Sequence, residues 1–169
     1  MEKDSRPQRF VEEILNRCSK DKGFAAQMRR ADNANTEFFS YGILCSFGID
    51  LERDEERLPY ALIGASLSRS KAALDGALGL GEALLRSVTT QDQGEARLRR
   101  ILACQTQQEL CLILRPLLNF LLSRGVMLKY TQLLEELIAF RYEKARTRIC
   151  LRWAQQFYHP QTINNKEEE

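Results

Sequence analysis

Hydrophobic residues recur along the chain at spacings of three and four, which is the period of an amphipathic α-helix. The clearest stripe follows Ser5 and Pro7, a pairing typical of a helix start. Its members share one face: Phe10, Val11, Ile14, Leu15 and Cys18. Leucine and alanine greatly outnumber valine and isoleucine, which favours helix over sheet. The pattern predicts an all-α fold, a compact bundle of about seven to nine helices in two subdomains.

Two further helices are predicted in the first fifty residues, one carrying Phe24 and Met28 and one carrying Phe38 and Phe39 and ending by Gly48. We expect the aromatic side chains to be buried and to anchor this part of the chain. Full burial of a large side chain contributes roughly 1.5–3 kcal/mol.

Five carboxylates precede the next predicted helix, and Asp50, Glu52 and Asp54 alternate as in a calcium-binding loop. Glu55 stands where that loop needs glycine, and Ala61 stands where it needs a bidentate glutamate. Carboxylates at a helix start oppose the positive end of its dipole. The sequence therefore predicts a helix N-terminus here and no metal site.

A glycine-rich segment over residues 76–81 superficially resembles a nucleotide-binding turn, but its spacing is wrong and no predicted strand precedes it. We interpret it as a flexible joint leading into a short helix at residues 82–86. Residues 89–94 then form the best candidate boundary. The predicted units are an N-terminal helical subdomain (1–94), a basic C-terminal helical subdomain (95–160) and a polar tail (161–169).

The second half begins with a stripe through Leu98, Ile101 and Leu102. Thr106 and Glu109 form a capping box at the start of the next helix. Proline inside a helix removes one backbone hydrogen bond, so a kink or restart is expected at Pro116. Gly125 ends that helix. Two more helices are predicted, through residues 133–140 and 149–157, the last one stopped by His159 and Pro160. In that last helix Trp153 and Phe157 belong to the core stripe, whereas Tyr158 is expected to be exposed.

The 169 residues are 44% hydrophobic and 28% charged, which is ordinary for a globular protein. No apolar run approaches the ~20 residues that span a bilayer, and the N-terminus is polar. We therefore expect a cytoplasmic protein with no membrane contact.

The net charge of +2 conceals an asymmetry along the chain. Residues 1–94 hold 13 Lys and Arg against 15 Asp and Glu, whereas residues 95–160 hold 11 against 5. A basic half is a candidate surface for a polyanion. Solvated helical surface explains the same excess equally well.

The residues that most catalytic sites need are scarce. The only histidine, His159, lies beside a proline, and no two of the five cysteines are closer than Cys104 and Cys111. The phosphate-binding loop and the Gly-x-Ser-x-Gly and His-Glu-x-x-His motifs are absent. Glu135 and Glu136 are expected on a solvent face. We predict no enzyme activity, no metal and no cofactor; a hydrolase built from dispersed carboxylates is the least favoured class.

Arginine suits a phosphate backbone because it stays charged and offers a planar fork of donors. In the last helix Arg148 and Arg152 are four apart, with Lys144 one turn earlier, and should form an exposed ridge. Alternatively, Arg29, Arg99 or Arg115 pair with carboxylates or cap helices within the protein. The candidate nucleic-acid-binding residues are Arg29, Arg30, Arg99, Arg100, Arg115, Lys144, Arg146, Arg148 and Arg152.

Several short motifs in this order resemble the CasB family, the small subunit of the type I-E CRISPR complex Cascade. Over residues 25–158 they are Ala-Gln-Met-Arg-Arg (26–30), Leu-Gly-Glu-Ala-Leu (80–84), Leu-Arg-Arg-Ile-Leu (98–102), Leu-Arg-Pro-Leu-Leu (114–118), Gln-Leu-Leu-Glu-Glu-Leu (132–137) and Arg-Trp-Ala-Gln-Gln-Phe-Tyr (152–158).

The resemblance implies a helical, non-catalytic protein of antiviral defence that binds RNA and DNA within an assembly. Its implied partners are the Cascade backbone and large subunits, a second copy of itself, the crRNA and the target DNA. Arg29 and Arg30 match the family's early basic pair, and Arg99 and Arg100 match its middle pair. The implied role is to stabilise the crRNA–target duplex and the displaced DNA strand. The alternative is a helical protein–protein adaptor that does not bind nucleic acid.

Overall fold

A computed structural model describes residues 4–160, within which the chain forms nine α-helices and one turn of 3₁₀ helix, η1. The predicted all-α fold is confirmed. No helix in that range is long and apolar enough to cross a membrane. The elements are α1 (Arg6–Lys20), α2 (Lys22–Met28), η1 (Glu37–Ser40), α3 (Tyr41–Ser46), α4 (Asp54–Ser70), α5 (Leu80–Ser87), α6 (Gln91–Leu102), α7 (Gln107–Ser123), α8 (Tyr130–Ala139) and α9 (Glu143–Tyr158).

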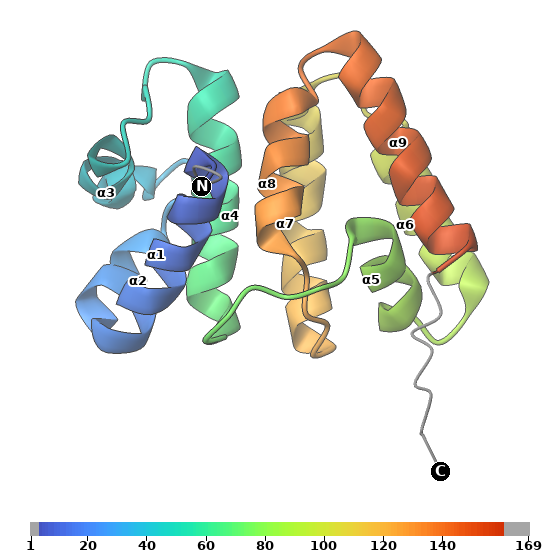
Figure 1. Cartoon of the computed structure of the whole chain (residues 1–169), viewed down its shortest axis with the longest axis horizontal. Helices are drawn as coiled ribbons and strands as arrows, with labels where there is room; N and C mark the ends of the chain where they lie inside the picture. Colours follow the sequence, from blue (N-terminus) through green and yellow to red (C-terminus); the bar gives the residue numbers. More distant parts are fainter. Residues whose placement is uncertain (1–3, 161–169) are drawn as a thin grey trace.

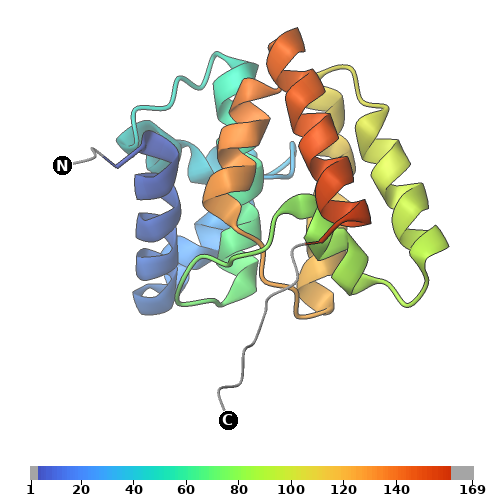
Figure 2. The same ribbon diagram turned by 45° about the vertical axis from the view of Figure 1, so that its right-hand side comes forward.

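Helix α4 lies between two groups of helices (Figures 1 and 2). It packs against α1 and α2 on one side and against α7 and α8 on the other. Helices α5, α6 and α9 form the end of the molecule farthest from α1 and α2, and α5 packs against α9. Residue 94 lies within α6, and the predicted division into two subdomains near it stays a prediction. The predicted tail, 161–169, lies outside the described residues.

The predicted helix starts are confirmed at two caps. Ser5 Oγ accepts a hydrogen bond from the backbone N–H of Gln8 at 3.3 Å, and Thr106 Oγ1 accepts one from Glu109 at 3.1 Å. The Glu109 carboxylate accepts in return from the backbone N–H of Gln105 at 2.9 Å. That residue precedes the cap, so the capping box closes one position earlier than the motif predicts.

Helix α7 runs unbroken through Pro116, so the structure shows no restart there. Proline removes the N–H that would bond to the carbonyl four residues earlier, at Leu112. Both residues lie on the exposed side of α7, where water can replace the missing donor.

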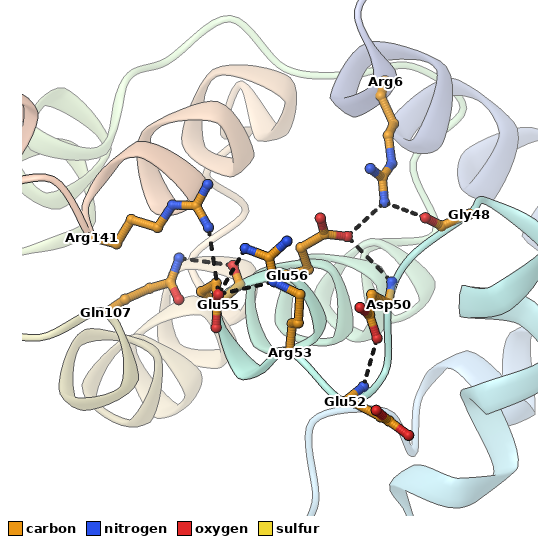
Figure 3. Close-up of polar contacts among 9 residues, drawn as sticks. All are labelled: Arg6, Gly48, Asp50, Glu52, Arg53, Glu55, Glu56, Gln107 and Arg141. Carbon is orange, nitrogen blue, oxygen red and sulfur yellow. Dashed lines mark hydrogen bonds and ion pairs between the residues drawn. The ribbon is translucent and has the colours of Figure 1, made fainter.

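Helix α4 is buried on all sides over residues 59–68. Pro59 leaves the carbonyl of Glu55, in the partly buried first turn of α4, without its helical donor. The side-chain amide of Gln107 supplies a donor instead, at 3.1 Å from Glu55 O (Figure 3). The same nitrogen lies 2.7 Å from Leu137 O. One buried amide therefore joins α4, α7 and α8.

Glu136 is buried, contrary to the prediction that it faces solvent. Its carboxylate accepts from Trp153 Nε1 at 2.7 Å and from Arg152 Nη1 at 3.0 Å. Trp153 is fully buried, as predicted, and its indole N–H needs an acceptor there. Tyr158 is exposed, also as predicted.

The prediction of buried aromatic side chains was wrong for Phe38 and Phe39, which are 57% and 43% exposed. They lie in η1, which has about three residues per turn instead of 3.6. In this turn Ser40 faces the interior, where its hydroxyl donates to Glu37 O at 2.7 Å, and the two rings point outward.

The extended segment of residues 71–79 connects α4 to α5 and crosses the bundle on its way (Figure 1). Its Asp75 carboxylate accepts from the backbone N–H groups of Tyr130 at 2.6 Å and Thr131 at 3.0 Å. Leu78 O accepts from Lys129 N at 2.8 Å. Asp75 thus satisfies two free donors at the start of α8 from a distant part of the chain.

Removing the Gln107 amide should destabilise the fold. We expect Gln107→Ala to lower the free energy of unfolding by about 1–3 kcal/mol, because one buried and one partly buried carbonyl lose a donor. Urea denaturation followed by circular dichroism measures this. Gln108→Ala, next to it but exposed, should change the value by less than about 0.5 kcal/mol. Equal effects of the two substitutions would show that the amide bridge contributes nothing.

Gly81 allows α5 to approach α9 closely. A Cβ at this position would overlap the backbone carbonyl oxygen of Trp153. We expect Gly81→Ala to lower the unfolding free energy by about 1–3 kcal/mol through overpacking. Gly42→Ala is the matched control, because no other atom lies within 4 Å of its Cβ position, and it should stabilise by about 0.4–1 kcal/mol. Thermal unfolding should separate the variants, and a neutral Gly81→Ala would contradict the close approach.

Candidate nucleic-acid interface

The predicted basic residues do not gather on a single surface. Arg29 and Arg30 follow α2, Arg99 and Arg100 are on α6, and Arg115 is on α7. The remaining four lie along α9: Lys144, Arg146, Arg148 and Arg152. The packing of these helices divides the nine residues into those that have internal partners and those that are free.

Three predicted residues contact acceptors on other segments of the fold. Arg146 Nη1 lies 2.8 Å from Gln105 O, and Arg152 Nη1 lies 3.0 Å from the buried Glu136 carboxylate. Arg115 Nε lies 3.5 Å from Asp32. For Arg115, pairing with a carboxylate inside the protein is the alternative to nucleic-acid binding that the sequence left open. A nucleic-acid contact by any of the three residues stays a prediction.

Asp32 is the buried partner shared by two arginines. Its side chain is only 3% exposed, and Arg69 contacts both of its oxygens, at 2.7 and 2.8 Å. Arg69 also donates to the carbonyl of Arg29 at 2.8 Å. The hydrogen bonds to Asp32 raise the pKa of Arg69. This ion pair fixes the chain after α2 to α4, and thereby the position of Arg29.

Other predicted cations remain free at the surface. Arg30, Arg100, Lys144 and Arg148 are exposed, and none has a carboxylate within ion-pair distance among residues 4–160. Arg99 lies 3.1 Å from Glu95 but keeps 74% of its side chain exposed. Such pairs contribute little at a surface, so its charge is still available.

Helices α6 and α7 enclose a shallow pocket of about 170 Å³ that includes one of these free charges, Arg100. Arg97 and Arg100 line it together with Phe120. The guanidinium carbon of Arg97 lies 3.9 Å from the centroid of the Phe120 ring, and that of Arg124 lies 5.2 Å from it. We call Arg97, Arg100, Arg124 and Phe120 the α6–α7 notch.

The electrostatics of the α6–α7 notch favour an anion. No carboxylate from residues 4–160 lines the pocket. Arg97 Nη1 is buried and has no hydrogen-bond partner within the described chain. Buried donors are normally paired, so this nitrogen, like Nε of Arg6, Arg57 and Arg115, is available to an acceptor from outside the described chain, either water or a ligand oxygen. A phosphate oxygen meets that need, because it forms short, charge-assisted bonds with guanidinium groups.

Sequence reasoning missed Arg97 and Arg124 as site residues. Arg97 and Arg100 are three apart and therefore share a helix face, which is a signal that could have selected Arg97. Arg124 caps the C-terminal end of α7, four residues after Phe120, whereas only the folding of α6 against α7 brings Arg97 to the same ring.

A second basic pocket lies among α1, α2 and the C-terminal end of α4. Lys22, Arg29 and Lys71 line it, and no carboxylate of the described residues does. Arg29 Nε donates to Ala25 O at 3.3 Å. Lys22 and Lys71, which sequence reasoning did not select, thus lie beside the predicted Arg29. Lys71 is found there only because α4 ends in a residue with left-handed backbone, φ 52°.

The predicted ridge on α9 is present in part. Lys144 and Arg148 are exposed and one turn apart. The third member, Arg152, turns toward Glu136, and Arg148 lines a pocket that also contains Glu135. Acidic groups therefore border the ridge on the side of α8.

The acidic segment of residues 50–56, at the start of α4, is held by arginines (Figure 3). Glu56 accepts from Arg6 Nη2 at 2.9 Å and from the backbone N–H of Asp50 at 3.3 Å. Glu55 accepts from Arg53 at 2.9 Å. These bonds help to lower the pKa of both glutamates. Among residues 4–160, no three His, Cys, Asp or Glu side chains are grouped to hold a metal ion.

Four of the five cysteine thiols are unsuited to nucleophilic chemistry at neutral pH. Burial raises the pKa of Cys111 to about 12 and that of Cys104 to about 11. Burial also raises the pKa of Cys18 and Cys150. Because the thiolate is the reactive form, these four residues act as small packing groups.

Comparison with known proteins identifies the family. The model of the family described as "CRISPR-associated protein Cse2" matches residues 25–158. No curated protein matches the chain.

Solved structures share the fold. CasB from Thermobifida fusca is 18% identical, with a TM-score of 0.69 over 91% of this chain and 98% of that one. CasB from M. ruber is 23% identical, with a TM-score of 0.69 over 92% and 94%. A Cse2-family protein from Thermus thermophilus is 20% identical, with a TM-score of 0.71 over 92% and 99%. Because the family model spans most of the chain, the resemblance to CasB is confirmed: the chain belongs to the Cse2 family of CRISPR-associated proteins.

Proposed function

We propose that this protein is the non-catalytic small subunit of a CRISPR RNA-guided surveillance complex, Cascade, and that it binds nucleic-acid backbone without sequence preference. Family membership supports the CRISPR context. The observation that carries the binding role is the α6–α7 notch, where the guanidinium groups of Arg97 and Arg124 lie at one ring, Arg100 lines the same pocket and a buried donor lacks a partner within the described chain.

The proposed mechanism leaves sequence recognition to base pairing with the guide RNA. The heteroduplex that forms is about as stable as the DNA duplex it replaces. A few phosphate contacts from this subunit therefore shift the balance toward the opened state. The α6–α7 notch holds backbone phosphates of the crRNA–target duplex or of the displaced strand.

The free cations extend this interface. Arg100 belongs to the α6–α7 notch, and Arg99 adjoins it on α6. Arg29 and Arg30 are proposed as a second contact near α2, and Lys144 and Arg148 as a third along α9. Arg115, Arg146 and Arg152 already have internal partners, so their main contribution is to fix the helices that carry the free charges.

A protein-binding role is the second candidate, and exposed leucines favour it. Leu112 on α7 is 70% exposed and Leu151 on α9 is 65% exposed. Both are suited to contacts with neighbouring subunits. A pure adaptor would bind partner subunits regardless of nuclease treatment and would show no affinity for DNA at low salt.

Salt dependence tests the backbone contact. Each phosphate contact with a single strand contributes about 0.7 to the slope of log K against log salt. We expect Arg100→Ala to reduce the slope by about that amount in fluorescence anisotropy titrations with single-stranded DNA, and Arg99→Ala with Arg100→Ala to reduce it further.

Arg53→Ala is the matched control, because Arg53 is also exposed but pairs with Glu55 in the acidic segment. It should leave the slope unchanged. If the Arg99 and Arg100 double variant keeps the affinity and slope of the native protein, this pair does not contact phosphate.

The proposed role predicts that a variant can lose its hold on target DNA while it still assembles with the other subunits. A variant with Arg100→Ala and Arg124→Ala should still copurify with the other Cascade subunits, because neither residue forms an ion pair that holds the fold within residues 4–160. The complex should dissociate from target DNA at least about tenfold faster, as expected for the loss of two charge-assisted hydrogen bonds. Unchanged dissociation with intact assembly would favour the adaptor.

A further inference from the structure

Two exposed phenylalanines form a stack with an arginine beside η1. The rings of Phe38 and Phe39 are 4.4 Å apart between centroids and inclined by 29°. The guanidinium carbon of Arg30 lies 4.3 Å from the centroid of Phe39. Phe38 remains 57% exposed, so this stack leaves ring surface open to solvent.

The chain around the stack is held by its own hydrogen bonds. Asn33 O accepts from the backbone N–H groups of Thr36 at 2.9 Å and Glu37 at 2.8 Å. Thr36 Oγ1 donates to Arg30 O at 3.1 Å. The rings therefore lie on a fixed frame, and a ligand that stacks on them loses little affinity to ordering of the site.

Once the nearby carboxylates are paired, the charge that remains beside the two rings is positive. Glu37 is occupied by Arg57 Nη1 at 3.1 Å, and Asp32 is occupied by Arg69 at 2.7 Å. Arg30 is exposed and has no carboxylate partner among residues 4–160. An aromatic surface beside an unpaired cation complements a ligand that is planar and anionic.

We propose that Phe38 is a stacking platform for an unpaired base of single-stranded nucleic acid, with Arg30 contacting the adjoining phosphate. Stacking on an aromatic ring tolerates any base, because every base has a π-face. Bases within a duplex are stacked on one another, so only an unpaired strand offers this surface. The inference rests on the proposed function and adds to it a base contact distinct from the backbone contacts.

Removal of the bases from the probe tests this contact. Fluorescence anisotropy at low salt compares an oligothymidylate with an abasic phosphodiester strand of the same length and charge. The native protein should bind the oligothymidylate at least about fivefold more tightly. Phe38→Leu should abolish that preference and leave affinity for the abasic strand within about twofold. Phe38→Trp should retain it.

Tyr142→Leu is the matched control. Tyr142 is 56% exposed and has Arg141 4.7 Å from its ring centroid, but Arg141 lies 3.8 Å from Glu55 and Tyr142 stacks on no second ring of the described chain. The preference for bases should survive this substitution. Circular dichroism should show that each variant keeps its helical content.

Four outcomes would overturn the proposal. In the first, Phe38→Leu keeps the preference; in the second, it weakens both strands equally. In the third, Phe38→Leu spares the preference but releases the protein from its partner subunits, which would assign the rings to a protein contact. In the fourth, the native protein binds both strands equally, which leaves the backbone role intact. Binding to neither strand would instead refute the proposed function itself.

Discussion

Burial of α4 over residues 59–68 is the constraint around which the other helices are arranged. A stretch covered on all sides must have its backbone groups satisfied by protein, and Pro59, at the start of that stretch, removes the donor to the carbonyl of Glu55 in the first turn. The amide of Gln107 restores it and reaches Leu137 with the same nitrogen. The position of α7 relative to α4 and α8 is thus determined by hydrogen bonding as well as by packing.

The arginines of this protein divide into two groups with different physical roles. Arg69, Arg146 and Arg152 donate to acceptors in other parts of the fold, and so they join segments that are distant in sequence. Arg97 and Arg100 line a pocket to which residues 4–160 contribute no carboxylate. The first group makes the scaffold rigid, and the second provides charge at its surface for a polyanion.

This division explains why charge alone is a poor guide to the interface. The excess of positive charge after residue 94 favours a polyanion partner, yet Arg152 is paired with Glu136 and Arg146 donates to a backbone carbonyl. Conversely, the N-terminal half is acidic in total, but Glu37, Glu55 and Asp32 are occupied by arginines. Arg30 is therefore free of carboxylate partners within the described chain, in a region whose net charge is negative.

The amino-acid sequence determined the helical class, the starts of two helices and the family, because hydrophobic period, caps at Ser5 and Thr106, and motif order are local properties of the chain. It also placed Trp153 in the core. It could not show that Glu136 is buried, that Arg124 joins Arg97 at Phe120, or that Phe38 and Phe39 point outward. Each of these depends on which helix faces are brought into contact, and that is decided by packing between segments far apart in sequence.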